Sequence, residues 1–461
     1  MKVQFDIEKI TRYDEAGPRY TSYPTAVAFS GTFTEADYLE QVQLSNDCFI
    51  PAPLSLYFHI PFCDTVCYYC ACNKIVTKDQ GKANQYLKYL CHEIDMQSAL
   101  FDNDRVVEQL HWGGGTPTFL NGQQMRSLMD YTRSHFNLLD NDQGDYSIEI
   151  DPRSVTPETI ALLRDIGFNR FSLGVQDVND QVQAAVNRIQ PIEDTIAIID
   201  ACREQDAKSI SIDLIYGLPL QTKESFNTTL ETIIDISPDR ISLFNYAHLP
   251  HLFKPQRRIN ATELPSAHNK LEILQHSIER LTQAGYVYIG MDHFAKPTDE
   301  LSKAQEEGHL HRNFQGYTTH ASCDLIAMGV SAISSVHNSY SQNEKTLDEY
   351  YAALDEKRLP IIRGVSLTNE DLLRRDIIQQ LSCQFVLDIK MIERDYRIDF
   401  RNHFSLEMAE LEMLAADDLL TIEQDSLRVT PAGRLLIRRI CMVFDTYLRE
   451  QRMEQRYSKV I

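Results

Sequence analysis

The sequence lacks any apolar run long enough to cross a bilayer as a helix, which takes about 20 predominantly apolar residues. It also lacks the apolar core of a secretory signal peptide in its first residues, MKVQFDIEKITRYDEAG. Positive charge is scarce, because 45 Lys and Arg stand against 66 Asp and Glu, for a formal net charge of −21. These absences predict a cytoplasmic protein that does not bind nucleic acid or anionic lipid by general electrostatic attraction.

No fixed-period repeat or low-complexity segment occurs in the 461 residues, which leave room for two or three globular domains. On so acidic a chain, an anionic small substrate would need a local basic pocket. Five basic residues are candidates for that pocket from their sequence neighbourhood: Arg12, Arg19, Lys74, Arg188 and Arg312. For any one of them, a solvated surface position is the ordinary alternative.

Three cysteines stand close together directly after an apolar run, in the segment HIPFCDTVCYYCAC. Cys63, Cys67 and Cys70 have the spacing C-x3-C-x2-C and offer three thiolates to one metal centre. An iron–sulfur cubane is usually held by four cysteines, one per iron, so three leave one iron open for chemistry. The amino and carboxylate groups of S-adenosylmethionine can chelate that iron, and cleavage of its sulfonium then releases a 5′-deoxyadenosyl radical.

Zinc is an alternative occupant of the same cysteines, with His59 or Cys72 as a fourth ligand. No second C-x2-C pair follows, as it would in most structural zinc sites. A disulfide framework fits poorly with a large acidic chain that has no secretory signal. The other cysteines are single: Cys48, Cys91, Cys202, Cys323, Cys383 and Cys441.

Strand-like and helix-like segments alternate through the middle of the chain. The expected strands are Leu54–His59, Val106–Trp112, Tyr146–Ile150, Arg170–Val175, Ser209–Ile215 and Arg240–Tyr246. The expected helices between them are Asn84–Leu100, Gln123–Phe136, Pro157–Ile166, Ile192–Glu204 and Lys223–Ile236. Six strand–helix units predict an α/β fold of parallel strands with helical crossovers.

Distinctive polar residues or glycines follow every one of these strands. The first strand leads into the cysteines, the second into Gly113–Gly115, and the third carries Glu149. In a β/α barrel the loops at the carboxyl ends of the strands share one face, whereas an open sheet concentrates function at one switch point. The spread over six strands favours a partial (β/α)6 barrel.

The flanking segments complete the expected organisation of the chain. Residues 1–50 are expected to cover the active site, 51–255 to form the barrel, and 256–362 to extend the barrel on the substrate side. Residues 363–461 should form a mostly helical, winged-helix-like domain, with a hairpin at 420–429 and a helix over Pro431–Tyr447.

Several residues at the expected barrel mouth suit S-adenosylmethionine. A run of three glycines, Gly113–Gly115, lets backbone approach a ligand closely and could hold the methionine amino group, although a tight turn is the ordinary reading. Glu149 and Asp213 could accept hydrogen bonds from ribose hydroxyls, as acidic residues do in dinucleotide sites. Tyr57 and Tyr69 flank the cysteines and could pack on adenine, although most such aromatics are core.

Many ungapped blocks of the sequence together resemble one family. With the cysteine loop, they make the chain similar to the radical S-adenosylmethionine enzymes, and among these to the oxygen-independent coproporphyrinogen III dehydrogenases, often called oxidases, of haem synthesis. The blocks are Gly17–Ala26, Cys70–Lys74, His111–Thr116, Gly174–Asp177, Asp213–Pro219, Phe244–His248, Met291–Phe294, His311–Gly316, Gly433–Ile437 and Phe444–Tyr447.

The resemblance implies that the propionates on rings A and B of coproporphyrinogen III become vinyl groups with loss of CO2, which gives protoporphyrinogen IX. The bond that breaks first is an unactivated C–H bond, which no side-chain base can deprotonate at neutral pH. A deoxyadenosyl radical abstracts the hydrogen atom instead. A monomer is implied, with an electron donor and an electron acceptor that the sequence does not name.

The resemblance also implies the cofactors, a 4Fe–4S cluster and two S-adenosylmethionine molecules. Cys63, Cys67 and Cys70 would ligate the cluster, whereas Cys72 belongs to a C-x-C signature outside the ligand set. The cluster-bound molecule would contact Tyr57, Gly114, Glu149 and Ile333. The second molecule would contact Tyr69, Gly115, Thr116, Gln176, Arg188, Asp213 and Ala247.

A haem-binding chaperone of the same superfamily is the alternative of a different functional class. Such chaperones typically carry an aromatic residue where Cys72 stands, and they lack the Gly-Pro-Arg-Tyr-Thr-Ser-Tyr-Pro segment that begins at Gly17. Both features favour the dehydrogenase. A zinc-stabilised binding protein is the third reading, and metal analysis would distinguish it.

Overall fold

The computed structural model describes residues 3–140 and 142–450. Its contacts divide the chain into two compact units. The first, here the barrel unit, consists of Phe29–Ile273 and Ser322–Ser366. The second, here the helical unit, combines the residues up to Ala28 with Leu274–Ala321 and the residues from Leu367 onward. The four consecutive segments expected from the sequence stay a prediction.

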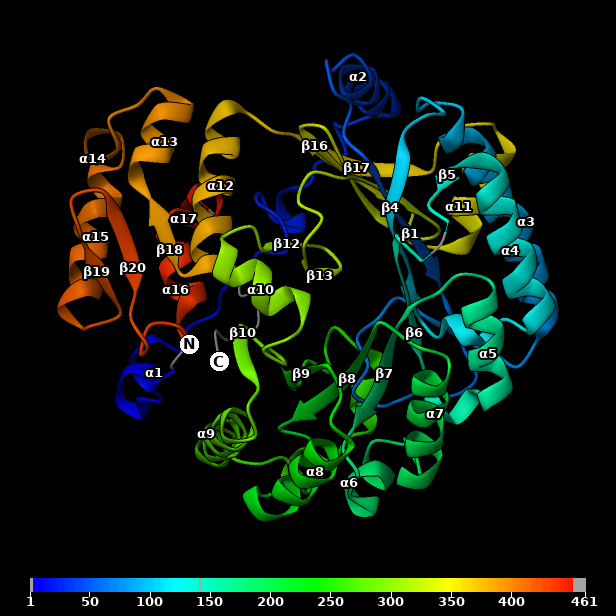
Figure 1. Ribbon diagram of the computed structural model, residues 1–461, viewed down its shortest axis with the longest axis horizontal. Coiled ribbons are helices and arrows are strands. Elements are labelled where there is room, and N and C mark those ends of the chain that lie inside the picture. Colours follow the sequence, from blue (N-terminus) through cyan, green and yellow to red (C-terminus); the bar gives the residue numbers. More distant parts are fainter. Residues whose placement is uncertain (1–2, 141, 451–461) are drawn as a thin grey trace. The chain divides into compact units, whose positions relative to one another are not determined.

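Six parallel strands form the centre of the barrel unit (Figure 1). Their order in the sheet is β9-β8-β7-β6-β4-β1, so neighbours in space are neighbours along the chain. This succession confirms the expected parallel strands of a partial (β/α)6 barrel. The strands are β1 (Leu54–Ile60), β4 (Val106–Gly114), β6 (Asp145–Ile150), β7 (Arg170–Gln176), β8 (Ser209–Tyr216) and β9 (Arg240–Asn245).

The crossover helices lie on the outer side of these strands (Figure 1). Side-chain caps begin several of them, because the first N–H groups of a helix have no partner within it. Asn121 and Thr222, for example, each accept from the backbone N–H three residues on. The helices are α3 (Gln80–Ser98), α4 (Gly122–His135), α5 (Pro157–Asp165), α7 (Ile192–Glu204) and α8 (Lys223–Ile236), and the sequence did not predict the short α6 (Asp180–Ala185).

The sheet continues past β1 with four strands that sequence periodicity did not predict. β14 (Asp324–Met328) pairs with β1 in parallel. The antiparallel strands β15 (Ile333–Val336), β16 (Ser339–Asn343) and β17 (Ile361–Ser366) follow. All residues of β14 and β16 are buried, so these strands show no apolar–polar alternation to detect.

Alternation along β1 separates the core from the site. Leu56, Phe58 and Ile60 are fully buried in the core. Tyr57 and His59 point to the opposite face, because successive side chains on a strand alternate. Tyr57 stacks on His111 of β4 with ring centroids 5.8 Å apart, so polar and aromatic groups line the inner face near the carboxyl ends.

The helical unit is built from short pieces. Two hairpins, β10 (Val287–Gly290) with β11 (His293–Ala295) and β12 (His311–Asn313) with β13 (Gly316–Thr318), precede its main helices. A small sheet in the order β18-β20-β19 contains the hairpin that was expected at 420–429. Its strands are β18 (Val386–Asp388), β19 (Leu420–Ile422) and β20 (Ser426–Val429). Its helices are α1 (Ile7–Tyr13), α10 (Glu300–Glu307), α12 (Asn369–Gln384), α13 (Ile389–Tyr396), α14 (Phe400–His403), α15 (Ser405–Ala416), α16 (Ile437–Met442) and α17 (Thr446–Glu450), and α9 (Ala267–Gln283) runs from the barrel unit into this one.

The helix expected over Pro431–Tyr447 is wrong in extent. The chain turns at 431–436 and is helical only in α16 and α17. Gly433 explains the turn, because a Cβ at this position would lie 1.9 Å from the carbonyl oxygen of Leu419. Backbone packed this closely against Leu419 admits glycine alone at position 433.

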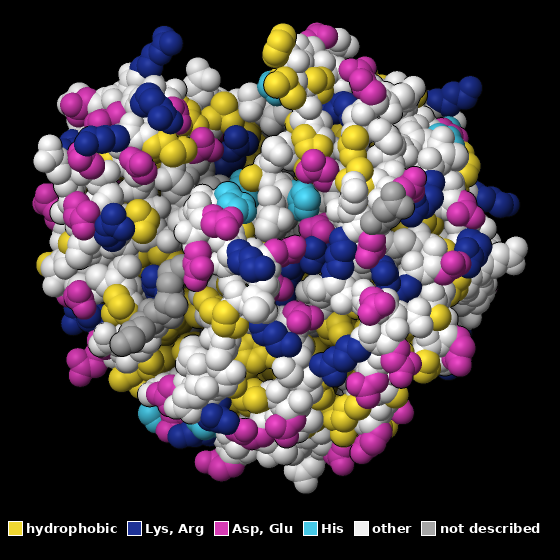
Figure 2. Space-filling view, viewed as in Figure 1, with side chains coloured by type: hydrophobic (Ala, Val, Ile, Leu, Met, Phe, Trp, Pro, Cys, Tyr) yellow, Lys and Arg dark blue, Asp and Glu magenta, His cyan; other side chains and the backbone are white. Residues whose placement is uncertain are grey.

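Acidic and basic side chains are interspersed on the face drawn in Figure 2. Within the residues that the structure describes, no helix has the length and apolar character that a membrane span requires.

A buried acid, Glu93 on α3, gives the first testable prediction. It accepts from Gly329 N at 2.7 Å, Asn343 Nδ2 at 2.7 Å and Tyr350 Oη at 2.5 Å. Burial, only partly offset by these donors, raises the pKa of Glu93 from 4.5 to about 7. The native state therefore keeps a proton that the unfolded chain releases, so the free energy of unfolding falls as pH rises between these two values.

Glu93→Gln removes this titration. We expect the unfolding free energy of wild type minus that of the variant to decrease from about pH 5 to about pH 8, because only the wild type carries the titrating group. Urea denaturation measures both values. A difference that does not change with pH would contradict the raised pKa.

Candidate functional site

A cavity of about 490 Å³ opens at the carboxyl ends of the barrel strands. Residues of the six strands, or of the loops that follow them, line this cavity together with the three clustered cysteines. Its lining includes Cys63, Cys67, Tyr69, Cys70, Cys72, Lys74, Gly114, Gly115, Thr116, Glu149, Asp151, Arg153, Ser172, Gln176, Arg188, Asp213 and Phe244. The barrel thus brings most of the expected site residues to one place.

Backbone hydrogen bonds fix the cysteine loop at both ends and in the middle. Ile75 N donates to Pro61 O at 2.6 Å, and Thr77 N donates to Cys63 O at 2.9 Å. In the middle of the loop, Tyr68 N donates to Val186 O at 2.9 Å. The three thiols are therefore held on one short, tethered loop, as ligands of a single metal centre must be.

Thiolates bind metals, so the protonation of the three thiols matters. A hydrogen bond from Cys72, together with nearby Lys74, lowers the pKa of Cys70 to about 5. Burial raises the pKa of Cys63 to about 11, although Thr116 Oγ1 donates to its sulfur at 3.5 Å. Metal binding would complete the deprotonation of the thiols, because a cysteine binds metal as the thiolate and loses its proton when it does so.

Two guanidinium groups face Cys67. Arg153 Nη2 lies 3.7 Å and Arg188 Nη1 lies 3.6 Å from its sulfur. Asp151 anchors both, accepting from Arg153 Nη2 at 2.6 Å and from Arg188 Nη1 at 3.1 Å. Positive charge next to this sulfur suits a thiolate and an anionic cluster. Three thiols with such donors fit an iron–sulfur cluster with one open iron.

The glycine turn after β4 packs directly against the start of the cysteine loop. Gly115 N donates to Ile60 O at 2.8 Å, and Thr116 N donates to Phe62 O at 2.7 Å. A Cβ on Gly115 would lie 2.7 Å from Phe62 O, so only glycine fits. Gly114 has φ of +111°, which also favours glycine. The turn therefore fixes the position of the loop that carries the thiols.

Glu149 of β6 points into the cavity with 45% of its side chain exposed. Burial would raise its pKa, but His111 and the N–H of Gly114 lower it below the usual value. Gly114 N donates to Glu149 Oε2 at 3.1 Å, and His111 Nε2 lies 3.4 Å from Oε1. The carboxylate is therefore ionised and available to accept hydrogen bonds from hydroxyl groups.

Asp213 and Gln176 add two acceptors on the next strands. Burial raises the pKa of Asp213 to about 6, and the charge of Glu149 adds to the shift. Gln176 Oε1 is buried and has no hydrogen-bond partner among the described residues. A buried acceptor without a donor is costly, so Gln176 fits a site whose ligand supplies the donor.

Three of the expected residues lie outside the cavity lining. Tyr57 Oη lies 3.2 Å from His59 Nδ1 on the same strand, Ala247 is the second residue after β9, and Ile333 begins β15. Their expected contacts stay a prediction. Sequence reasoning missed Arg153 as a cavity residue, although its position directly after Asp151-Pro152, at the end of a strand, was a usable signal.

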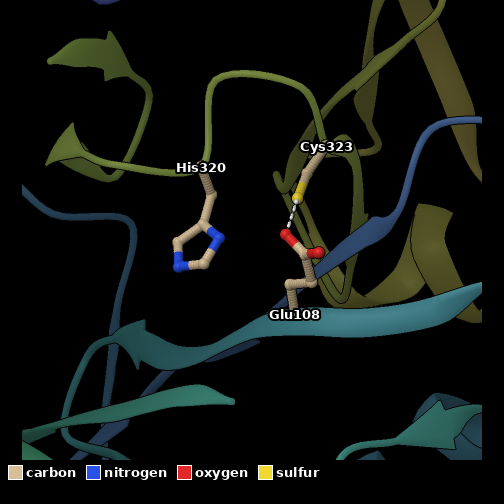
Figure 3. A group of neighbouring side chains, drawn as sticks. All are labelled: Glu108, His320 and Cys323. Carbon is tan, nitrogen blue, oxygen red and sulfur yellow. Dashed lines mark hydrogen bonds between the residues drawn. The ribbon is translucent and has the colours of Figure 1, made fainter. Parts of the chain in front are cut away.

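The single cysteines take no part in this cavity. Cys323, for example, donates its thiol to Glu108 Oε2 at 3.8 Å (Figure 3). Burial and the charge of Glu108 raise the pKa of Cys323, so it stays a thiol. Cys202, Cys383 and Cys441 are buried.

Comparison with known proteins adds independent findings. The family model "Radical SAM superfamily" matches residues 57–233, and the model "HemN C-terminal domain" matches residues 367–436. The oxygen-independent coproporphyrinogen III oxidase of Pseudomonas aeruginosa is 53% identical over 100% of this chain and 99% of its own. The enzyme of that name from Escherichia coli K12 is 50% identical with the same coverage. A solved structure of the E. coli enzyme, described as a radical SAM enzyme, superposes with a TM-score of 0.92 at 49% identity, covering 97% of this chain and all of that one.

Proposed function

Because the chain belongs to the oxygen-independent coproporphyrinogen III oxidases of the radical SAM superfamily, we propose that it converts coproporphyrinogen III to protoporphyrinogen IX. The propionates of rings A and B become vinyl groups. Each loses one hydrogen atom, one CO2 and one electron, so an electron acceptor takes part in the reaction. An electron donor is also needed for each cleavage of S-adenosylmethionine. A monomer in the cytoplasm is part of the proposal.

One observation carries the proposal: the thiols of Cys63, Cys67 and Cys70 share one cavity wall. Three cysteine ligands suit a 4Fe–4S cluster with one iron left for S-adenosylmethionine. When bound, the cluster and this cofactor supply a 5′-deoxyadenosyl radical, which can abstract a hydrogen atom that no side-chain base could remove as a proton.

The residues of the chain would bind and orient the cluster and S-adenosylmethionine. Arg153 and Arg188 would balance the negative charge of the cluster at Cys67. Glu149 would accept hydrogen bonds from the ribose of the cluster-bound S-adenosylmethionine, and the Gly114 turn would hold its methionine end.

A second S-adenosylmethionine is a separate part of the proposal. The cavity volume of about 490 Å³ lies in the range for one cofactor-sized ligand. The proposal of a second molecule is therefore supported by the residues expected around it and by the family resemblance. Asp213 and Gln176 offer acceptors that the first molecule would leave free. The other residues expected around it are Tyr69, Gly115, Thr116, Arg188 and Ala247.

The direct test is anaerobic reconstitution with iron and sulfide, followed by reduction and addition of S-adenosylmethionine and coproporphyrinogen III. We expect protoporphyrinogen IX and 5′-deoxyadenosine, with two deoxyadenosines formed per product. A fully loaded cluster with a competent electron donor that yields neither compound would reject the proposal. Stoichiometric haem binding without turnover would instead support a haem chaperone.

A further inference from the structure

Five basic residues were candidates for an anion pocket, and the structure separates them by their partners. Four are engaged within their own units. The partners are Asp417 for Arg12 at 2.7 Å, Asp292 for Arg19, Cys70 O for Lys74 at 3.1 Å and Asp151 for Arg188 at 3.1 Å. The fifth, Arg312, makes no ion pair among the described residues.

Arg312 is only 4% exposed. Its Nε and Nη1 atoms are buried and have no hydrogen-bond partner in the described part of the chain. The guanidinium instead lies over the ring of Tyr317, 4.6 Å from the centroid. A guanidinium stacked on a ring keeps its N–H bonds in the plane of the group, directed away from the ring. The aromatic contact therefore leaves these donors unsatisfied.

The surrounding structure holds Arg312 in place. It pairs with Tyr317 across the β12–β13 hairpin. Gln379 of α12 bonds both backbone groups of Arg312, accepting from its N–H at 3.1 Å and donating to its carbonyl at 2.6 Å. Tyr317 Oη donates to Ser382 O at 3.2 Å and fixes the ring beneath the guanidinium. The unsatisfied donors therefore belong to a rigid hairpin braced on both strands.

Positive charge is concentrated around this hairpin. Burial is the largest cause that lowers the pKa of Arg438 to about 10, and the charges of Arg19 and Arg312 lower it further, against the opposing effects of Asp292 and Tyr20. The guanidinium groups of Arg19, Arg312 and Arg438 are therefore neighbours and make this region locally cationic, beside the Asp292 carboxylate that pairs with Arg19. Such a region attracts an anion and repels a cationic ligand.

Buried charges in proteins are normally paired, because an isolated buried ion pays its full desolvation cost. An arginine kept buried without a counter-ion fits a site whose counter-ion arrives with a ligand. We propose that Arg312 binds one propionate carboxylate of the porphyrinogen substrate through charge-assisted hydrogen bonds. This inference rests on the proposed function, because that function supplies a substrate with several carboxylates.

Binding can be measured separately from turnover with the reconstituted holoenzyme. The probes are coproporphyrin III, a stable tetracarboxylate, and its tetramethyl ester, each titrated anaerobically by fluorescence. We expect Arg312→Met to weaken coproporphyrin III binding by about tenfold or more, the effect of losing a hydrogen bond to a charged group. Affinity for the ester should stay within about twofold of wild type, because the ester offers no carboxylate.

Two further variants make the result specific. Arg312→Lys keeps the charge but loses the planar donor geometry, so we expect an intermediate loss of affinity. Arg12→Met, which removes an exposed guanidinium of the same unit, should bind both probes as wild type does. Since Arg312→Met removes an unpaired buried charge, its melting temperature should equal or exceed that of wild type.

Equal affinity of wild type and Arg312→Met for coproporphyrin III, or equal weakening for acid and ester, would overturn the proposal. A marked drop in melting temperature with binding retained would also overturn it, by showing a structural role. Failure of the proposed function is distinguishable, because it appears as a wild type that binds coproporphyrin III without decarboxylating the porphyrinogen.

Discussion

Replacing Cys67 with serine is expected to abolish cluster assembly, deoxyadenosine formation and decarboxylation together. A serine hydroxyl stays protonated and is a poor ligand for iron in an iron–sulfur cluster. The change would also leave Arg153 and Arg188 facing an uncharged oxygen in place of the sulfur that they approach at 3.7 and 3.6 Å. Iron and sulfide analysis, with the absorbance of the reconstituted protein, measures the loss directly.

Cys72→Ser is the matched control, because Cys72 lies two residues from Cys70 and lines the same cavity. We expect its iron content to equal that of wild type after reconstitution, since Cys72 is outside the proposed ligand set. Loss of the cluster in Cys72→Ser would show that Cys72 is a fourth cysteine ligand. The iron position that S-adenosylmethionine needs would then be occupied in the wild type.

Replacing Arg105 with methionine is expected to cause a large loss of stability in the barrel unit. Arg105 Nη2 and Asp324 Oδ2 form an ion pair of 2.6 Å, with side chains 2% and 8% exposed. Removing one partner of a buried pair leaves the other charge unpaired, which costs about 3–5 kcal/mol. Asp324 begins β14, so its anchor also fixes the strand that pairs with β1. The melting temperature should fall by about 6–20 °C.

Arg126→Met supplies the control for burial. Arg126 and Asp165 are 2.5 Å apart, but their side chains are 47% and 64% exposed. An exposed pair of this kind contributes about 0–1 kcal/mol, so the melting temperature should barely change. Scanning calorimetry of both variants compares the same substitution at two levels of burial. Equal shifts in melting temperature would show that burial does not increase the contribution of the Arg105 pair to stability.

The barrel strands could be predicted because their sequence signal is local. Each strand is a short apolar or β-branched segment, and helices follow five of them, several beginning with a side-chain cap. The observed strand ends lie within two residues of the expected ones, as β1 (Leu54–Ile60) and β8 (Ser209–Tyr216) show. The position of the thiols at the carboxyl ends followed from the same alternation, since all these ends share one face.

The remaining features depend on contacts between distant segments. β16 is buried along its whole length although it reads Ser-Tyr-Ser-Gln-Asn, because its polar side chains find partners such as Glu93. The turn at Gly433 arises from its approach to Leu419. Whether a basic residue has a partner is likewise invisible in the sequence. Arg188 and Arg312 look alike there, yet Arg188 has an aspartate partner and Arg312 has none among the described residues.

The discontinuity of the two units sets an order of events on the ribosome. Every segment of the barrel unit precedes Leu367, so this unit can close while the remaining chain is still being translated. Residues 18 and 20 emerge long before the residues that they contact: Tyr20 Oη donates to Asp445 at 2.9 Å, and Arg438 Nε donates to Pro18 O at 2.9 Å. The amino-terminal segment can therefore make these contacts only after Arg438 and Asp445 have been synthesised, and a premature stop before Arg438 would leave it without both.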